Sequence, residues 1–216
     1  MSAARRIGLL GGSFNPPHLA HLALGRLARR ALALDELRWL PAGAPWQKAG
    51  RPMAQAAHRL AMLGLLLADE PDVLIDPREL QRAGATFTID TVRELQAEQL
   101  KLHSTPAEWF LILGQDQYSR FDTWHDWPEL LQRCTLAVAG RAGQAPQAPA
   151  ALAAAPHRLI PLDLPPQDIA ANDIRTRLAA GQPVAALVGE RVAGYISQHG
   201  LYQQGNLPET PRDTPH

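Results

Sequence analysis

Short apolar runs with strand character alternate along this chain with longer stretches of helical periodicity. The runs expected to form strands are 7–10, 37–40, 73–75, 109–113, 135–139 and 159–161. The stretches expected to form helices are 19–31, 55–68 and 89–100. Because parallel strands need a long crossover between them, this alternation predicts βαβ units. We therefore expect an α/β protein with a parallel sheet flanked by helices on both faces and with C-terminal helices.

The composition suits one compact domain. The chain has 216 residues, of which 46% are apolar, and this is enough to bury a single sizeable core. We place that domain at residues 1–202 and expect the proline-containing end, 203–216, to be a disordered tail. The segment 141–156 is rich in Ala, Pro and Gln and is expected to be a flexible or irregular connection.

The charge balance and the apolar runs limit the partners and the compartment. Lys plus Arg equals Asp plus Glu, at 21 each, so no overall field favours nucleic acid or an anionic membrane as the main partner. The longest apolar run, 60–68, is too short to span a bilayer, and 7–10 is too short for the core of a secretory signal. The one cysteine, Cys134, excludes an internal disulfide and a multi-cysteine metal site. We expect a cytoplasmic protein, and the sequence leaves its oligomeric state open.

The segment 11–21 carries the most information about function. It has the sequence G-G-S-F-N-P-P-H-L-A-H and lies where the first strand ends and the first helix begins. In parallel sheets this junction aims backbone N–H groups and a helix N-terminus at a ligand, and phosphate is the ligand it favours. Gly11 and Gly12 let the backbone approach that ligand closely. His18 and His21 share a helix face and can donate hydrogen bonds to phosphate oxygens.

Other interpretations of this segment explain less of it. Its spacing fits neither of the common phosphate loops, G-x-x-x-x-G-K-[ST] and G-x-G-x-x-G. A Gly-Gly pair alone is usually a plain turn, and two histidines at this spacing can be half of a zinc site. No further cluster of Cys or His completes such a site, so we expect no metal bound by the protein itself.

The same segment resembles the signature G-G-[ST]-F-[DN]-P-x-H-x-G-H of the nucleotidyltransferase superfamily, whose fold is Rossmann-like. Ala20 stands where that family has a glycine. The resemblance implies that His18 and His21 are the catalytic residues. They would stabilise a pentavalent transition state, with no covalent enzyme intermediate. It also implies an ATP site that contains both histidines and Gly11, Gly12, Ser13 and Phe14.

A later segment resembles bacterial nicotinate-mononucleotide adenylyltransferases. L-G-Q-D-Q at 113–117, followed by F-D-T-W at 121–124, is similar to their G-x-D…W pattern. The resemblance implies acceptor contacts from Gly114, Asp116 and Trp124. Asp116 can accept hydrogen bonds from ribose hydroxyls, and Trp124 can offer a π-face to a pyridine ring. Composition alone would favour Trp124 as an ordinary core aromatic.

Two further segments extend the resemblance on the acceptor side. Residues 79–91, E-L-Q-R-A-G-A-T-F-T-I-D-T, are similar to the family's R-x-x-x-S-Y-T-I-D-T, which implies that Thr86 and Thr88 hold the nicotinate carboxylate. A helix entry capped by Thr88 is the structural alternative, and both can hold together. The loop after the second expected strand resembles P-x-x-x-P-x-[HQ]-K, which implies a phosphate contact from Lys48. Arg141 matches an arginine that follows the fifth strand in the family.

The segment 169–175, I-A-A-N-D-I-R, resembles the family's I-S-S-T-x-I-R. This implies a helix N-terminus that receives ATP phosphates, with Ile174 and Arg175 in the ATP site. The family's hydroxyl residues are replaced by A-A-N at 170–172, so backbone N–H contacts are retained and hydroxyl contacts are lost. Asn172 can still cap the helix.

The resemblance extends from about Ile7 to Tyr202 and implies an enzyme of NAD biosynthesis. It would transfer the adenylyl group of ATP to nicotinate mononucleotide, giving deamido-NAD and pyrophosphate. Mg²⁺ is expected to be carried by the ATP phosphates, because the sequence offers no local carboxylate cage. Three alternatives stay open: a preference for nicotinamide mononucleotide, another nucleotidyltransferase that shares only the histidine motif, and a non-catalytic nucleotide-binding module.

Overall fold

The computed structural model describes residues 4–43, 53–71, 73–103, 106–140 and 144–203. Within these residues, six strands form one sheet: β1 (Arg6–Gly12), β2 (Glu36–Pro41), β3 (Leu74–Ile75), β4 (Glu108–Gly114), β5 (Thr135–Ala139) and β6 (Leu159–Leu162). All neighbouring strands are parallel, and their order across the sheet is β3-β2-β1-β4-β5-β6. Every expected strand is therefore confirmed, with ends that differ by at most a few residues.

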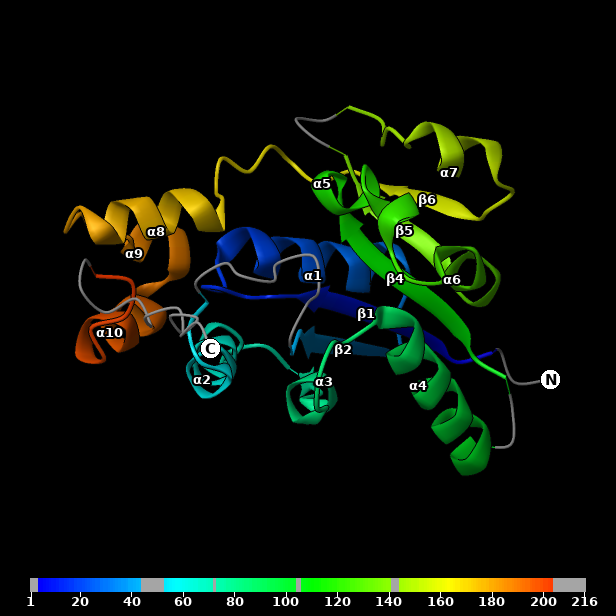
Figure 1. Ribbon diagram of the computed structural model, residues 1–216, viewed down its shortest axis with the longest axis horizontal. Helices are drawn as coiled ribbons and strands as arrows, with labels where there is room; N and C mark the ends of the chain where they lie inside the picture. The colour runs from blue at the N-terminus through cyan, green and yellow to red at the C-terminus, as the bar shows by residue number, and fades with distance from the viewer. Residues whose placement is uncertain (1–3, 44–52, 72, 104–105, 141–143, 204–216) are drawn as a thin grey trace, which may run out of the picture.

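The helices connect the strands and continue after the last of them (Figure 1). Their bounds are α1 (Leu19–Ala31), α2 (Ala56–Leu66), α3 (Arg78–Gln81), α4 (Thr88–His103), α5 (Gln115–Tyr118), α6 (Trp127–Arg133), α7 (Ala150–Ala154), α8 (Ala171–Ala179), α9 (Ala185–Val188) and α10 (Glu190–Gln198). A 3₁₀ turn, η2, covers Phe121–Thr123.

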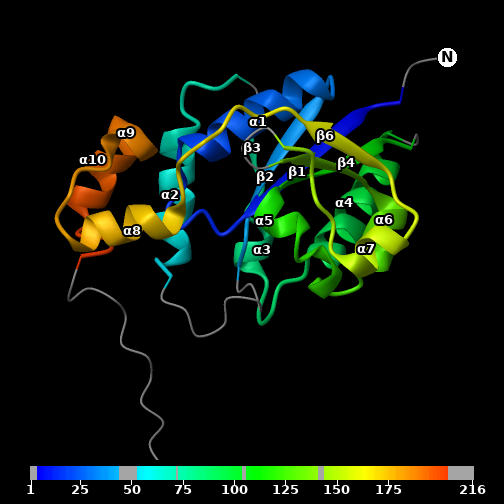
Figure 2. The ribbon, with the colours of Figure 1, turned by 90° about the horizontal axis from the view of Figure 1, so that it is seen from above.

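Neighbouring residues along each strand face two different cores, because side chains alternate between the faces of a sheet. Leu10 and Ile112 belong to a cluster formed with α1, α2 and the C-terminal helices. Leu9 and Leu111, one residue away, belong to a second cluster with α4, α5 and α6. The sheet is thus the middle layer of three, and Figure 2 shows α1 on one side of it and α4, α6 and α7 on the other. The predicted architecture is confirmed.

Helix α1 packs tightly against β2, and this contact sets the position of the helix start. A Cβ atom at Gly25 would lie 2.5 Å from the indole of Trp39, so only glycine permits this approach. Leu22 and Ala28 are buried on the same side of α1. As a result the N-terminus of α1 is held at the carboxyl end of β1.

The strand order reverses between β1 and β4. From β1 the chain moves outward through β2 to β3, and after α4 it returns to β4 on the other side of β1 and moves through β5 to β6. Crossovers that leave in opposite directions open a crevice at the carboxyl ends of the two central strands. Leu10 of β1 pairs with Ile112 of β4 close to that end.

The last three helices lie together at the end of the molecule opposite the N-terminus, with α10 beside α2 (Figure 1). Val192 and Ile196 of α10 are buried in the same core cluster as α2. The hydroxyl of Tyr195 lies 3.0 Å from Nδ1 of His58, and this contact also joins the two helices.

The connection between β5 and β6 differs from the sequence expectation. The segment 141–156 is not irregular throughout, because α7 occupies 150–154, between Pro149 and Pro156. Alanine has a high helix propensity, and this accounts for the short helix. Residues 204–216 of the expected tail lie outside the described residues, so the disorder of the tail stays a prediction.

Candidate active site

A cavity of about 510 Å³ lies at the carboxyl ends of β1 and β4, where the strand order reverses. Its walls come from the loop after β1, the start of α4, the start of α5, residues 124–125, and the segment 164–171. These segments are far apart in the sequence, and the parallel topology brings them to one edge of the sheet.

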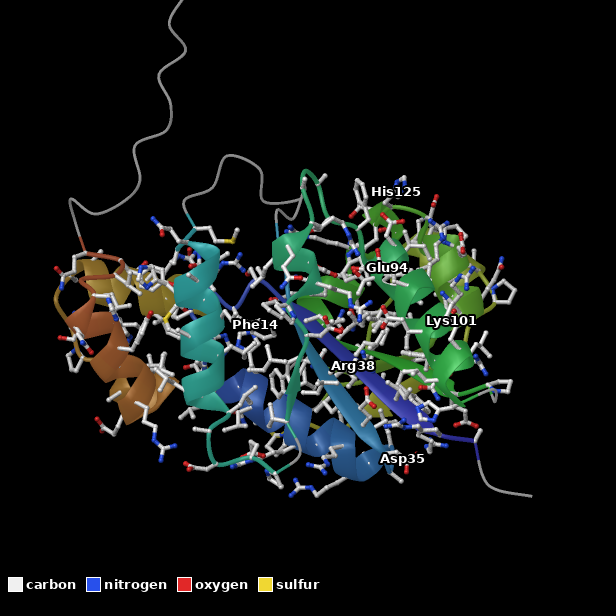
Figure 3. The ribbon with its side chains drawn as sticks, turned by 90° about the horizontal axis from the view of Figure 1, so that it is seen from below. Phe14, Asp35, Arg38, Glu94, Lys101 and His125 are labelled. Carbon is white, nitrogen blue, oxygen red and sulfur yellow. The ribbon has the colours of Figure 1, made fainter. Side chains whose placement is uncertain are left out.

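The loop after β1 forms one wall and is shaped by close packing. Phe14 has a φ of 45°, in the left-handed region, and its ring is buried. A Cβ atom at Gly12 would lie 3.1 Å from that ring, so glycine leaves the space that the ring needs. Figure 3 shows Phe14 between α2 and the strands. Gly11, Gly12, Ser13 and Phe14, the predicted loop contacts, all line the cavity.

His18 and His21 both line the cavity at the start of α1. Their rings stack with centroids 3.7 Å apart, and the backbone N–H of His18 donates to Nδ1 of His21 over 3.2 Å. His18 is 6% exposed, and burial lowers the pKa of its imidazole to about 4, so the ring is neutral near pH 7. Nδ1 of His18 is buried with no hydrogen-bond partner in the described residues. A neutral imidazole still has one N–H to donate, and this ring borders a cavity of ligand size.

Thr86 and Thr88 line the cavity where α4 begins. Thr86 is 6% exposed, and its hydroxyl is buried without a hydrogen-bond partner in the described part of the chain. The proposed capping role of Thr88 is wrong: α4 begins at Thr88, and the carbonyl of Phe87 accepts the N–H of Thr91. Phe87 therefore holds the cap position, and its ring lies 4.4 Å from that of His125.

Gly114, Asp116 and Trp124 also meet at the cavity. Gly114 ends β4 and precedes α5, and Asp116 is exposed in the first turn of that helix. The indole of Trp124 rests on Phe121, with centroids 5.2 Å apart, and its Nε1 has no hydrogen-bond partner in the described residues. Trp124 thus packs on the core and also borders the cavity, and its contact with the acceptor stays a prediction.

Helix α8 brings its N-terminus to the cavity, where Ala170 and Ala171 contribute to the wall. The structure does not bring Ile174 there, since this side chain is 0% exposed in the core and its N–H donates to the carbonyl of Ala170. Arg175 donates to the carbonyl of Asn15 over 2.8 Å and to Oδ1 of Asn172 over 3.1 Å, and it is not part of the cavity wall.

The expected cap from Asn172 is wrong. Ala170 holds the cap position of α8 and no side chain caps it, while Asn172 is the second residue of the helix. Its side-chain oxygen instead accepts a hydrogen bond from Arg175. Lys48 and Arg141, the two remaining predicted contacts, lie outside the described residues.

Several residues of the cavity wall were not expected from the sequence. Glu79 is 7% exposed, and its carboxylate accepts a hydrogen bond from the hydroxyl of Thr91 over 2.8 Å. Burial raises the pKa of this carboxyl, and the bond from Thr91 opposes that shift. Asn15 is buried in the loop after β1, where its Oδ1 accepts from the hydroxyl of Tyr202 and from the N–H of Ala54. A single Glu or Asn within a motif does not indicate from the sequence that its side chain is buried and hydrogen-bonded.

The described residues contain no group of three or more His, Cys, Asp or Glu side chains arranged to hold a metal ion. Across the same residues, no helix combines the length and the apolar character that crossing a bilayer requires.

Comparisons with known proteins agree with this geometry. The family model for cytidylyltransferase-like proteins matches residues 9–177. A probable nicotinate-nucleotide adenylyltransferase of Methylibium petroleiphilum is 46% identical over 213 residues, which cover 96% of this chain and 98% of the relative. The protein of the same name from Bordetella petrii is 48% identical over 204 residues, with 92% and 100% covered.

Among solved structures, the nicotinic acid mononucleotide adenylyltransferase of Plasmodium falciparum, complexed with NaAD, superimposes with a TM-score of 0.74. The match covers 92% of this chain and 97% of the other, at 17% sequence identity. At that identity the likeness concerns the fold, and it agrees with the three-layer parallel architecture.

Proposed function

Because this chain belongs to the cytidylyltransferase-like family, and within it to the nicotinate-nucleotide adenylyltransferases, we propose that it transfers the adenylyl group of ATP to nicotinate mononucleotide. A phosphate oxygen of the acceptor attacks the α-phosphorus of ATP in line. The bond from that phosphorus to the bridging oxygen breaks, and pyrophosphate leaves with the bond electrons. The products are deamido-NAD and pyrophosphate, and the enzyme acts in NAD biosynthesis.

The observation that carries this proposal is the stacked pair of His18 and His21 at the edge of the cavity. Charge builds on the oxygens of the α-phosphate as the new bond forms, and donors already in place stabilise it without reorganisation. Both rings are fixed by the start of α1, and His18 is neutral because it is buried. The pair therefore acts by hydrogen bonding and positioning. Positioning and charge stabilisation together can supply about 7–11 kcal/mol of barrier reduction.

The ATP side of the site consists of the loop after β1 and the N-terminus of α8. Gly11, Gly12, Ser13 and Phe14 offer backbone groups to the phosphates, and the first turn of α8 offers further N–H groups beside Ala170. Arg175, the fifth residue of α8, donates to the carbonyl of Asn15, a residue of the cavity wall, and adds positive charge to this side of the site.

The acceptor side is the wall formed by Thr86, Thr88, Gly114, Asp116 and Trp124. The unpartnered hydroxyl of Thr86 is a donor suited to the nicotinate carboxylate, and Asp116 is an acceptor suited to ribose hydroxyls. Trp124 borders the pyridine ring. Lys48 and Arg141 are proposed as further phosphate contacts of the acceptor, on the strength of their sequence motifs.

The nucleotide substrate is MgATP. Asp116 and Glu79 are the two carboxylates of the described cavity wall, and they do not form a cage, so the protein groups fit a cation that arrives on the phosphates. The bound cation neutralises phosphate charge, while the residues named above bind and orient the two nucleotides. We place the reaction in the cytoplasm.

Pyrophosphate release with ATP and nicotinate mononucleotide tests the function directly, with deamido-NAD identified as the second product. The matched assays replace the acceptor with nicotinamide mononucleotide or omit it. We expect the acid acceptor to give the highest kcat/KM. Faster turnover of the amide would change the assigned acceptor. Tight ATP binding without turnover of either acceptor would favour a non-catalytic binding module.

A further inference from the structure

Arg59 of α2 is the largest side chain in the described residues that is fully buried, at 1% exposure. Its guanidinium donates to four backbone carbonyls: Nε to Ala54 over 3.1 Å, Nη1 to Ser13 over 2.8 Å and to Ala42 over 2.7 Å, and Nη2 to Gly43 over 3.4 Å. These four carbonyls come from three separate stretches of the chain. Together they surround the guanidinium with hydrogen-bond acceptors.

This cation has no ion pair with a carboxylate among the described residues. All its hydrogen-bond acceptors are neutral, and the nearby titratable group is the phenol of Tyr202. Burial lowers the pKa of the guanidinium, which nevertheless stays charged. Burying a charge without a counter-ion is unfavourable for the free energy of folding. Joining the loops together is therefore not enough to explain a charged side chain at position 59.

Two of the four carbonyls belong to residues that line the cavity. Ser13 lies in the loop after β1, Ala42 follows β2, and both residues line the cavity, whereas Arg59 does not. The two loops are also joined directly, because the N–H of Ala42 donates to the carbonyl of Gly12 over 2.8 Å. Arg59 thus holds, from behind, the backbone that faces the ligand space.

The direction of these carbonyls determines the direction of the next N–H groups. In a trans peptide the C=O and the N–H point in opposite directions. The one cis bond in the described residues is Asn15–Pro16, so the units Ser13–Phe14 and Ala42–Gly43 are trans. With their carbonyls turned toward Arg59, the N–H groups of Phe14 and Gly43 point away from it.

We propose that Arg59 is a positioning residue for the nucleotide phosphates, and that it acts through these two peptide units. Its guanidinium binds the carbonyls of the two units, so the N–H groups of Phe14 and Gly43 point the other way, toward the phosphates. The positive charge of Arg59 then lies directly behind these N–H groups. Aligned peptide dipoles backed by a cation form an anion site that needs no reorganisation. The inference rests on the proposed function, since it takes phosphate groups to be the ligand of this cavity.

The test measures the affinity for ATP (with Mg²⁺) and for adenosine by calorimetry, in Arg59→Met and Arg59→Lys. Adenosine has no phosphate, so a residue that acts on phosphates changes the affinity for ATP alone. In Arg59→Met we expect ATP to bind about 10-fold more weakly and kcat to fall about 10–100-fold, with adenosine binding changed less than about 2-fold. Arg191→Met removes an exposed arginine that pairs with Asp69 over 2.8 Å, and it should change neither affinity.

Arg59→Lys keeps the charge but cannot reproduce the planar fork, so ATP should bind about 3-fold more weakly in it while adenosine binding is retained. This variant decides the outcome if Arg59→Met does not fold. Equal losses of ATP and adenosine, or unchanged ATP binding in a folded variant, would overturn the proposal. If the wild-type protein binds ATP but turns over no acceptor, the proposed function fails, and the comparison of ATP with adenosine still tests Arg59.

Discussion

The backbone N–H of His18 donates a hydrogen bond to Nδ1 of His21, three residues ahead, while the two imidazole rings stack 3.7 Å apart. A backbone N–H can only donate, so Nδ1 of His21 must be the acceptor and carries no proton in this arrangement. The proton of neutral His21 is therefore on Nε2. The start of α1 thus fixes the tautomer of one histidine, and burial keeps the other uncharged.

Removing either imidazole should slow the chemical step. We expect His18→Ala and His21→Ala each to lower kcat by about 10²–10³-fold, the scale of losing one preorganised donor. The affinity for ATP should change less, because most phosphate contacts come from the backbone. Steady-state pyrophosphate release measures both quantities. His103→Ala, at the exposed end of α4, is the control, and wild-type turnover in either test variant would exclude that histidine from the mechanism.

The burial of His18 should also appear in the pH dependence of stability. The pKa is about 4 in the folded protein and 6.5 in the unfolded chain, so between these values the unfolded state binds more protons. The free energy of unfolding contributed by His18 is fully present above pH 6.5 and is lost as pH falls, by about 3 kcal/mol near pH 4.

His18→Gln has no titrating ring and should lose less stability than the wild type between pH 7.5 and 4.5. Urea unfolding at several pH values measures the difference, in which the contributions of other groups cancel. A constant difference between the two proteins across this range would show that His18 titrates alike in the folded and unfolded states.

Trp124→Ala should raise the KM for the acceptor much more than the KM for ATP. Stacking on a pyridine ring is worth about 1–3 kcal/mol, on the scale of bases stacked on aromatic side chains. Since the indole also packs on Phe121, a modest fall in melting temperature is expected as well. Trp124→Phe keeps a ring face and should retain part of the acceptor affinity. Equal increases in both KM values, together with a lower melting temperature, would identify Trp124 as a core residue only.

Thr86→Val should move stability and acceptor binding in opposite directions. The hydroxyl is buried without a partner in the described structure, so an isosteric methyl should leave the free energy of unfolding unchanged or raise it by about 1 kcal/mol. The KM for nicotinate mononucleotide should rise about 10-fold, because the acceptor loses a donor. Thr176→Val, on the exposed side of α8, is the control. A lower stability with an unchanged KM would place the role of Thr86 in folding.

The regular parts of the fold could be predicted because their signals are local. The alternation of apolar runs and helical stretches located all six strands of the described sheet and the helices α1, α2 and α4. Short helices were missed because one or two turns leave little periodicity. In α6 a signal was present, since Pro128 lies at its start and Asp126 precedes it. In α7 the signal was a run of alanines between two prolines.

The lining of the cavity was predictable where a motif and the end of a strand coincide, as at Gly12, His18 and Gly114. The lining was less predictable where tertiary contacts determine which way a side chain points. Ile174 lies in the motif, yet its side chain turns into the core. In the sequence Arg59 is one more polar residue of a helix, and nothing local indicates that its guanidinium is enclosed by carbonyls from two loops. Such contacts depend on the packing of α2 against the sheet, which no local pattern encodes.

The departure of α8 from the family pattern gives the last prediction. Without the usual hydroxyls at 170–172, any phosphates at this helix start are held by backbone N–H groups and by Arg175. Two hydrogen bonds already direct the guanidinium, to the carbonyl of Asn15 and to Oδ1 of Asn172, and among the described residues its other N–H donors have no further partner. Arg175 should then matter more than a single phosphate contact usually does.

Arg175→Ala should lower kcat/KM for ATP by the equivalent of about 1.5–3 kcal/mol, which is the range for a hydrogen bond to a charged group. Arg175→Lys should retain only part of the wild-type kcat/KM. An ammonium lacks the planar guanidinium that can donate to the carbonyl of Asn15 and to a phosphate oxygen at the same time. The double change Ala171→Ser and Asn172→Thr restores hydroxyls and releases Arg175 from Asn172, so activity should stay the same or improve. If the double variant folds and Arg175→Ala leaves ATP use unaffected, α8 is not the phosphate site. The ATP phosphates would then be held by the loop after β1 and by Lys48.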